Sequence, residues 1–175
     1  MELEVQHLAP YLPFGLKLKY SIVKPDGKIV LEYTGIMKSI SHNEDETHPT
    51  RIQVNHEEFE HIWMFKPIIR PMSDIIKEIE IDGEKFVPLL VLAGMAGICS
   101  ASDFIIDGYQ ARHKTCTEST FELGISNDFI WKESSKWKDF GAVPQQLRMF
   151  NKLFEWHFDV FNLIKNNLAI DINKI

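Results

Sequence analysis

The amino-acid sequence predicts a single α+β domain over residues 1–175, in which an antiparallel sheet, built from an N-terminal hairpin and central strands, packs against one long C-terminal amphipathic helix. Three observations predict this fold class. Residues near the N-terminus alternate between apolar and polar, turn-forming residues divide the middle, and the last third has apolar residues at helical spacing. With 45% hydrophobic and 11% aromatic residues, the chain can also bury the core that such a domain needs.

The N-terminal part of the sheet is predicted to be a hairpin over residues 16–33. Its first strand alternates a polar set with an apolar set, which consists of Leu16, Leu18, Tyr20 and Ile22. Pro25-Asp26-Gly27 predicts the turn, because Pro fixes φ and Gly accepts a positive φ, and residues 28–33 return as the partner strand. Before the hairpin, two prolines and a glycine predict an irregular segment over residues 7–15.

Central strands complete the predicted sheet. They are expected at residues 35–40, 51–54, 85–92, 104–106, 120–125 and 129–132. Asp82-Gly83 predicts a tight turn, and Ser73-Asp74 predicts the N-cap of a short helix that runs to about Ile79. Small residues over residues 91–101 allow close backbone packing but weaken any helix there.

The long helix is predicted over roughly Pro144–Leu168. Pro144 suits the first turn of a helix, and seven positions follow at steps of three and four residues, at Leu147, Phe150, Phe154, His157, Phe161, Ile164 and Leu168. A second stripe widens this face at Leu153, Trp156, Val160 and Leu163. We expect the face to pack on the sheet, with His157 as a hydrogen-bonded core histidine. Binding of a partner protein through part of the face is the alternative.

Hydropathy and cysteine usage predict where the protein works. The sequence has no apolar run long enough to cross a bilayer, and residues 1–5 lack the basic and apolar regions of a signal peptide. The two cysteines, Cys99 and Cys116, are too few for a disulfide framework and are expected to be reduced and buried. We therefore expect a cytoplasmic protein without a membrane partner.

Acidic residues are concentrated between His42 and His61. The formal net charge of the chain is −6, which argues against direct binding to nucleic acid. In this stretch a single Arg51 accompanies six carboxylates, namely Glu44, Asp45, Glu46, Glu57, Glu58 and Glu60. These six are candidate partner-binding residues, because an acidic surface attracts a basic protein. The alternative is a solvated loop that keeps the protein in solution.

No catalytic, cofactor or metal site is predicted. His56 and His61 lie five positions apart, whereas the zinc-binding H-E-x-x-H pattern places its histidines four apart on one helix face. Pairs such as His56 with Glu60, completed by His42 or His48, leave a metal-dependent hydrolase as an alternative. The sequence lacks the glycine-rich phosphate-binding motifs and the G-x-S-x-G nucleophile motif.

A second set of candidate partner-binding residues combines basic and aromatic side chains. It comprises Arg112, Lys114, Trp131, Lys132, Lys136 and Trp137. Tryptophan can stack on bases while lysine binds the phosphate backbone, so a nucleic-acid-binding regulator centred on residues 131–138 is a further alternative. Glu133 and Asp139 dilute the positive charge of that segment.

Three segments carry a resemblance to a known group of proteins. They are Leu8-Ala9-Pro10-Tyr11-Leu12-Pro13 with Gly15-Leu16, the central Ile69-Arg70-Pro71-Met72-Ser73-Asp74 with Asp82-Gly83-Glu84-Lys85-Phe86-Val87-Pro88, and residues 151–173 around Phe154-Glu155-Trp156-His157-Phe158-Asp159-Val160-Phe161. Together they resemble a family of small, uncharacterised proteins encoded by phages and prophages of Bacteroidota. The acidic stretch and residues 91–142 do not follow this resemblance.

The resemblance implies a biological setting. No catalytic residue is assigned to the family, so none is carried over to this chain. The resemblance implies a non-enzymatic accessory protein that acts in the cytoplasm of a bacterial host cell and binds a host protein. The most specific expectation is an inhibitor of a bacterial defence system, of the anti-CRISPR type, whose partner is a CRISPR effector nuclease such as an RNA-guided RNase, or its ribonucleoprotein.

Overall fold

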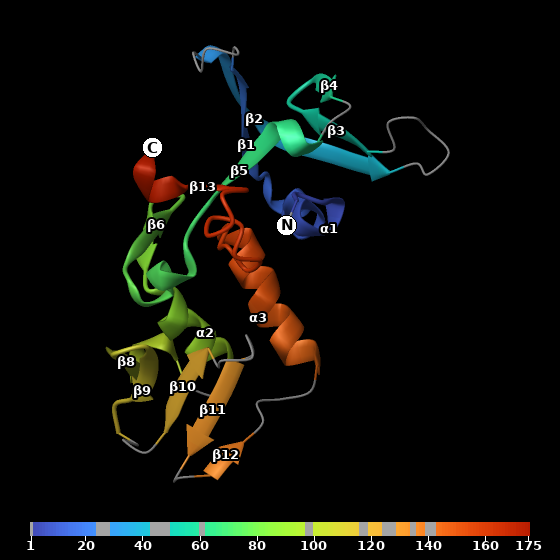
Figure 1. Ribbon diagram of the computed structural model, residues 1–175. Helices are drawn as coiled ribbons and strands as arrows, with labels where there is room; N and C mark the ends of the chain where they lie inside the picture. Colours follow the sequence, from blue (N-terminus) through green and yellow to red (C-terminus); the bar gives the residue numbers. More distant parts are fainter. Residues whose placement is uncertain are drawn as a thin grey trace. The chain divides into compact units, whose positions relative to one another are not determined.

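The computed structural model describes residues 2–23, 29–42, 50–59, 62–96, 100–115, 119–123, 129–133, 136–138 and 143–175 (Figure 1). The chain divides into two compact units, which are described separately: unit 1 consists of Met1–Pro71 with Leu153–Ile175, and unit 2 consists of Met72–Lys152. The prediction of one domain over residues 1–175 stays a prediction. None of the helices in the described ranges has the length and hydropathy of a membrane-spanning helix.

Unit 1 is built on a six-stranded sheet with the order β13-β5-β1-β2-β3-β4. The strands are β1 (Lys17–Val23), β2 (Ile29–His42), β3 (Thr50–Val54), β4 (Glu57–Phe59), β5 (Phe65–Ile69) and β13 (Ile170–Asp171). The N-terminal hairpin is confirmed, because β1 pairs antiparallel with β2 from Lys17 opposite Ile36 to Val23 opposite Ile29. The predicted turn at residues 25–27 lies outside the described residues. The sheet is not entirely antiparallel, since β13 runs parallel to β5.

Strand β2 changes its partner halfway along its length. Its residues up to Ile36 pair with β1, and its residues from Met37 pair with β3, so that the strand continues past the end of β1 (Figure 1). Asn55 fixes this junction: its Oδ1 accepts a hydrogen bond from the Ile36 N–H at 2.9 Å, and its backbone N–H donates to the Ile36 carbonyl at 2.8 Å. Gly35 is required beside it, because a Cβ there would lie 2.6 Å from Cγ1 of Val54. The predicted strands at residues 35–40 and 51–54 are confirmed as parts of β2 and β3.

The core of unit 1 is aromatic and aliphatic. The segment predicted to be irregular is in fact helical, with α1 (Val5–Leu8) followed by a 3₁₀ helix at Ala9–Phe14 that ends at Gly15, whose φ is 65°. This segment buries Tyr11 completely, edge-on to Phe154 at 5.0 Å between ring centroids. Further core residues come from the N-terminal segment, the sheet and the C-terminal segment, among them Leu8, Leu16, Leu18, Met37, Ile52, Val54, Phe65 and Leu163.

The predicted long C-terminal helix is wrong, and with it the predicted fold class. Helix α3 runs only from Val143 to Glu155. At its end the Phe158 N–H donates to the Leu153 carbonyl at 2.8 Å and the His157 N–H donates to the Phe154 carbonyl at 3.0 Å. This pair of hydrogen bonds, together with a left-handed residue directly after the helix C-cap, is the Schellman motif that terminates helices. Here the left-handed residue is His157, with a φ of 57°.

Beyond α3 the chain continues in turns. Asn162 and Asn167 also adopt left-handed φ values of 57° and 59°, which a helix cannot contain. Apolar residues of this segment still reach the core: Phe158 and Leu163 are fully buried, and Phe161, Ile164 and Leu168 pack against the core while partly buried. The helical spacing of apolar residues therefore predicts burial at most of these positions, although Leu147 is 57% exposed, and it predicts a helix correctly only in its first half.

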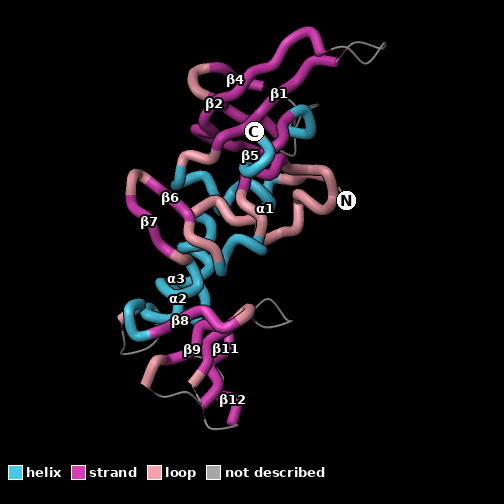
Figure 2. Tube along the Cα trace, turned by 90° about the vertical axis from the view of Figure 1, so that its left-hand side faces the viewer, coloured by secondary structure: helices cyan, strands magenta, loops and turns pink. Residues whose placement is uncertain are grey.

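Unit 2 contains a two-stranded hairpin, a helix, most of α3 and a second sheet. The hairpin joins β6 (Ile79–Ile81) to β7 (Glu84–Phe86), which lie side by side in Figure 2. The predicted tight turn is confirmed, with left-handed φ values at Asp82 and Gly83 of 52° and 84°. Helix α2 (Pro88–Ala96) follows. The five-stranded sheet has the order β12-β11-β10-β9-β8, with β8 (Phe104–Asp107), β9 (Gln110–His113), β10 (Thr120–Leu123), β11 (Phe129–Glu133) and β12 (Lys136–Lys138).

Several sequence predictions for unit 2 are settled by these elements. The strands predicted at residues 104–106 and 129–132 are confirmed as β8 and β11, and the strand predicted at residues 120–125 is confirmed over residues 120–123 as β10, with residues 124–125 outside the described ranges. The strand predicted at residues 85–92 is wrong beyond Phe86, because Pro88 lacks the N–H that a ladder needs and starts α2 instead. The helix predicted up to Ile79 is only a 3₁₀ turn at Met72–Ile76, and Asp74 is buried within it rather than capping it. Gly94 of α2 does permit close packing, since a Cβ there would lie 2.8 Å from the Ala101 nitrogen.

Candidate protein-binding site

The acidic candidates that the structure describes lie on an edge strand of unit 1. Glu57 and Glu58 belong to β4, the last strand of the six-stranded sheet, and both are exposed. Glu44, Asp45, Glu46 and Glu60 lie outside the described residues. A short edge strand that carries charge resists pairing with other strands, so this edge is suited to side-chain contacts rather than to sheet extension.

The basic and aromatic candidates lie in unit 2. Arg112 of β9 is half-buried with its Nε 3.1 Å from Oδ2 of Asp107, and Lys114 donates to the Ser102 carbonyl. The remaining four lie on two paired strands, in a register that sets Lys132 opposite Trp137, Trp131 opposite Lys138 and Glu133 opposite Lys136. Within unit 2, an ion pair with Asp107 thus holds Arg112 and a hydrogen bond holds Lys114, while the backbone register brings together Trp131, Lys132, Lys136 and Trp137.

The histidine cluster is described only in part. His56 lies exposed in the turn between β3 and β4, next to Glu57, while Glu60, His61 and His48 lie outside the described residues. Within the described ranges, no three His, Cys, Asp or Glu side chains are grouped as a metal site requires. Cys99 and Cys116, predicted to be buried thiols, also lie outside these ranges.

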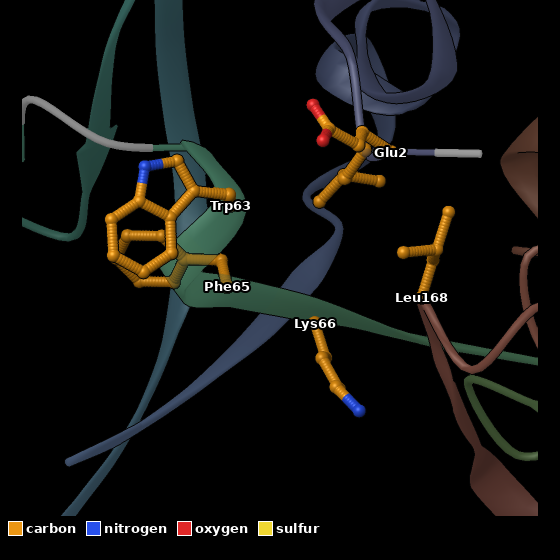
Figure 3. Close-up of a pocket in the computed structure, with 6 residues that line it drawn as sticks. Glu2, Trp63, Phe65, Lys66 and Leu168 are labelled. Atoms are coloured by element: carbon orange, nitrogen blue, oxygen red, sulfur yellow. The ribbon is translucent and has the colours of Figure 1, made fainter.

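A solvent-facing hollow of unit 1 supplies a feature that the sequence did not single out. It follows the 3₁₀ turn at Ile62–Met64 and has a volume of about 350 Å³, with a lining of Glu2, Leu3, Trp63, Phe65, Lys66 and Leu168. Figure 3 shows Trp63 and Phe65 on one side of it, with Glu2 and Leu168 on the other. Trp63 is 68% exposed, although Phe65, two residues later, is buried in the core.

A second hollow also borders Leu3. Its volume is about 500 Å³, and its lining consists of Leu3, Glu4, Val5, Gln6, Thr50 and Ile62. Because buried Leu3 lines both hollows, they are neighbours on unit 1. The two hollows together are called here the Leu3 groove; residues of the N-terminal segment and of the 3₁₀ turn that carries Trp63 line both of them.

The charged groups of the Leu3 groove are mostly acidic. Glu2 and Glu4 are exposed, one in each hollow, and the Glu4 carboxylate accepts a hydrogen bond from the Gln6 amide at 2.7 Å. Lys66 is the cation of the lining, but its Nζ donates to Oδ1 of Asn167 at 3.1 Å and points away from the Glu2 carboxylate (Figure 3). A ligand in the groove would meet carboxylates at its mouth.

A buried polar cluster elsewhere in unit 1 holds the C-terminal segment in place. The Tyr11 hydroxyl donates to the Phe158 carbonyl at 2.6 Å, and burial raises the pKa of this phenol far above its ordinary value. His157 Nε2 donates to the Phe14 carbonyl at 2.9 Å, and burial, assisted by the positive charges of Lys17 and Arg70, lowers the pKa of the imidazole. Burial also raises the pKa of Asp159, against two backbone N–H groups that favour its charged form. His157 is hydrogen-bonded as the sequence predicts, although it does not lie in a helix.

The groove residues escaped sequence reasoning for a physical reason. Trp63 lies within the aromatic stretch of residues 59–65, where Phe59 and Phe65 pack on each other with ring centroids 4.9 Å apart. The sequence of this stretch does not distinguish Trp63, whose side chain the 3₁₀ turn directs outward, from the buried aromatic residues beside it. Leu3 and Leu168 lie near opposite ends of the chain, so only the fold brings them to one surface.

Comparisons with known proteins identify no similar protein. No protein-family model matches the chain, no curated protein matches it, and no solved structure matches its fold.

Proposed function

We propose that this chain is a non-catalytic, phage- or prophage-encoded accessory protein that binds a host protein and inhibits a bacterial defence system. An effector of the CRISPR type, such as an RNA-guided RNase or its ribonucleoprotein, is the proposed partner. The sequence resemblance supplies the biological setting. The structural observation that carries the binding role is Trp63, which is 68% exposed beside an apolar hollow.

An exposed tryptophan at a hollow supports protein binding on energetic grounds. Tryptophan buries a large apolar area, and it is among the residues that contribute most to protein–protein affinity when a partner covers it. Glu57 and Glu58 lie on β4, which immediately precedes the segment leading to Trp63 in the chain. A basic partner would be attracted by these carboxylates, as nucleic-acid-binding effectors expose basic surfaces.

Reconstituted inhibition tests the proposal. Purified chain is titrated into RNA-guided RNase ribonucleoproteins from Bacteroidota, and RNA cleavage and co-elution in size-exclusion chromatography are measured. We expect a stable complex and loss of cleavage at a stoichiometric amount of the chain. Trp63→Ala should weaken inhibition by about tenfold or more. Tyr109→Ala is the matched control, because Tyr109 is an 80% exposed aromatic residue of unit 2.

The stoichiometry separates a binder from an enzyme. A binder needs about one chain for each effector particle, whereas an enzyme inactivates many particles per chain and continues to do so with time. Inhibition at strongly substoichiometric amounts would overturn the non-catalytic part of the proposal. Absence of both complex and inhibition at a large molar excess over every effector tested would overturn the partner.

The alternative of a nucleic-acid-binding regulator has its own observation, the Lys and Trp residues that the register sets opposite each other on β11 and β12. Lysine contacts to phosphate predict binding that weakens as salt increases. Labelled single-stranded RNA, measured by fluorescence anisotropy at several salt concentrations, tests this. Salt-sensitive binding that is lost in Lys132→Gln/Lys136→Gln, together with no effector complex, would favour the alternative.

A further inference from the structure

The Leu3 groove has two apolar compartments with one carboxylate at each. Around buried Leu3, the side chains of Glu2 and Glu4 remain exposed, and each lines a different hollow. On the opposite wall, Trp63 lines the first hollow and Ile62 lines the second. The groove thus repeats one combination twice: an apolar recess with an acidic group beside it.

Lys66 is the one cation among the described lining residues of the two hollows. The ammonium of Lys66 is bound to Asn167 and points away from Glu2 (Figure 3). Arg51 follows Thr50 on β3, but successive side chains of a strand point to opposite faces, and buried Ile52 shows that Thr50 shares the inner face. Of the described residues, Glu2 and Glu4 therefore supply the exposed carboxylates at the two hollows.

We propose that the Leu3 groove docks a basic amphipathic segment of the partner protein, with one apolar side chain in each hollow and Lys or Arg side chains at Glu2 and Glu4. This inference rests on the proposed function, for which it names the contact surface and the chemistry of the partner segment. Volumes of about 350 and 500 Å³ are each ample for a large apolar side chain. Because the groove consists of two hollows that share Leu3, a segment with two separate anchors fits it better than one compact small molecule.

Synthetic peptides test the chemistry of the groove without the effector. Three fluorescein-labelled peptides of equal length are compared by fluorescence anisotropy: an amphipathic Leu/Lys peptide, a Leu/Glu peptide with the same apolar pattern, and a Ser/Lys peptide with the same charges. The Leu/Lys peptide should bind, and the other two should bind about tenfold more weakly or less. Equal binding of Leu/Lys and Leu/Glu, or of Leu/Lys and Ser/Lys, would overturn the proposal.

Variants of the chain locate the binding. Trp63→Ala and the double variant Glu2→Gln/Glu4→Gln should each weaken binding of the Leu/Lys peptide by about tenfold. Gln keeps the acceptor that Glu4 offers to Gln6, so the α1 segment retains that hydrogen bond. Tyr109→Ala and Glu80→Gln/Glu84→Gln match these changes at exposed positions of unit 2 and should bind as the wild type does. Unchanged binding in both groove variants would overturn the assignment.

The same variants separate this inference from the proposed function. If wild-type chain inhibits an effector and the two groove variants inhibit it equally well, the function stands and the groove is not the docking surface. If the Leu/Lys peptide binds in the groove but no effector is bound or inhibited, the partner class fails while the chemistry of the groove stands. Retained circular dichroism spectra and unfolding temperatures show that the variants are folded.

Discussion

The carboxylate of Asp159 accepts a hydrogen bond from the backbone N–H of Leu163 at 2.7 Å. Its second oxygen accepts from the Ile164 N–H at 2.9 Å, and the side chain is only 5% exposed. The backbone N–H of Asp159 also donates to the Arg70 carbonyl at 2.8 Å, and this bond holds the chain where it leaves α3. One buried carboxylate therefore organises the segment that the sequence pattern alone assigned to a helix.

Removing this carboxylate should destabilise the protein strongly. Asp159→Ala leaves two backbone N–H groups in a buried environment without their acceptor, and we expect a loss of about 2–4 kcal/mol in the free energy of unfolding, at about 1–3 kcal/mol for each unsatisfied group and partial relaxation. Urea unfolding measures this. Asp171→Ala is the control: Asp171 accepts from the Asn173 N–H at 3.0 Å near the surface, and its loss should cost about 1 kcal/mol or less. Equal losses in the two variants would contradict this role of Asp159.

The stability of the protein should fall on mild acidification because of His157. Its pKa is lowered in the folded state relative to about 6.5 in the unfolded chain, so the unfolded state binds more protons between these two values. The contribution of His157 to the free energy of unfolding is therefore fully present above about pH 6.5 and decreases as the pH falls from this value toward the lowered pKa of the folded state. Asp159 contributes in the opposite sense and at lower pH, since its raised pKa makes the folded state bind more protons above about 3.8.

His157→Asn isolates this contribution. Asparagine accepts the left-handed φ of 57° more readily than most residues, so the backbone at the end of α3 is retained. Urea unfolding at several pH values between about 5 and 7.5 should show a flatter pH dependence in the variant than in the wild type. An identical dependence in the two proteins would show that His157 does not carry it.

Substitution of Gly35 should disturb the junction in β2. In Gly35→Ala the added Cβ would lie 2.6 Å from Cγ1 of Val54 and 2.8 Å from Nδ2 of Asn55, closer than van der Waals contact allows. Asn55 Nδ2 also donates to the Tyr33 hydroxyl at 2.9 Å, so its displacement costs a second interaction. We expect a loss of about 1–3 kcal/mol in thermal or urea unfolding. Thr34→Ala, at the exposed neighbouring position, should change stability by about 0.5 kcal/mol, and a similar loss there would contradict the steric explanation.

The hydroxyl of Tyr11 should contribute to stability through one bond. Tyr11→Phe keeps the aromatic packing on Phe154 but removes one of two donors to the Phe158 carbonyl, which still accepts from the Val160 N–H at 3.0 Å. We expect a loss of about 0.5–1.5 kcal/mol in the free energy of unfolding, the usual net contribution of one hydrogen bond. Tyr109→Phe, at an 80% exposed tyrosine, should be neutral within about 0.5 kcal/mol. Equal stabilities of the Tyr11 variant and the wild type would show that water or another donor replaces the hydroxyl.

Truncation of two tryptophans of unit 1 should change the free energy of unfolding by very different amounts. Trp63 is 68% exposed, so Trp63→Ala should change the free energy of unfolding by about 0.5 kcal/mol or less. Trp156 is 7% exposed, and Trp156→Ala should cost about 3–5 kcal/mol. Differential scanning calorimetry compares the two. A large loss on changing Trp63 would mean that it serves the fold rather than a partner.

Local pattern was sufficient for the N-terminal hairpin and for the turn at Asp82-Gly83, and it failed at the end of α3. Period-two alternation and Asp-Gly turns identified the β1–β2 hairpin and the turn at Asp82-Gly83, because alternation and positive φ are properties of neighbouring residues. The Schellman ending of α3 carries histidine where glycine is usual, so the sequence lacked the signal that normally stops a helix. The hydrogen bonds that join this segment to Phe14, Arg70 and Tyr11 involve residues far away in the chain.

The sequence by itself determined which residues are apolar, where turns are permitted and that the chain is acidic. Only the tertiary structure decided that Phe158 and Leu163 reach the core through turns, that β13 pairs parallel with β5, and that Trp63 faces solvent beside Leu3. The physical reason is that periodicity records how often a side chain is buried, whereas the path of the backbone depends on which distant donors and acceptors satisfy it. A long helix and a chain of capped turns can bury the same side chains, and the buried partners of Asp159 and His157 select the turns.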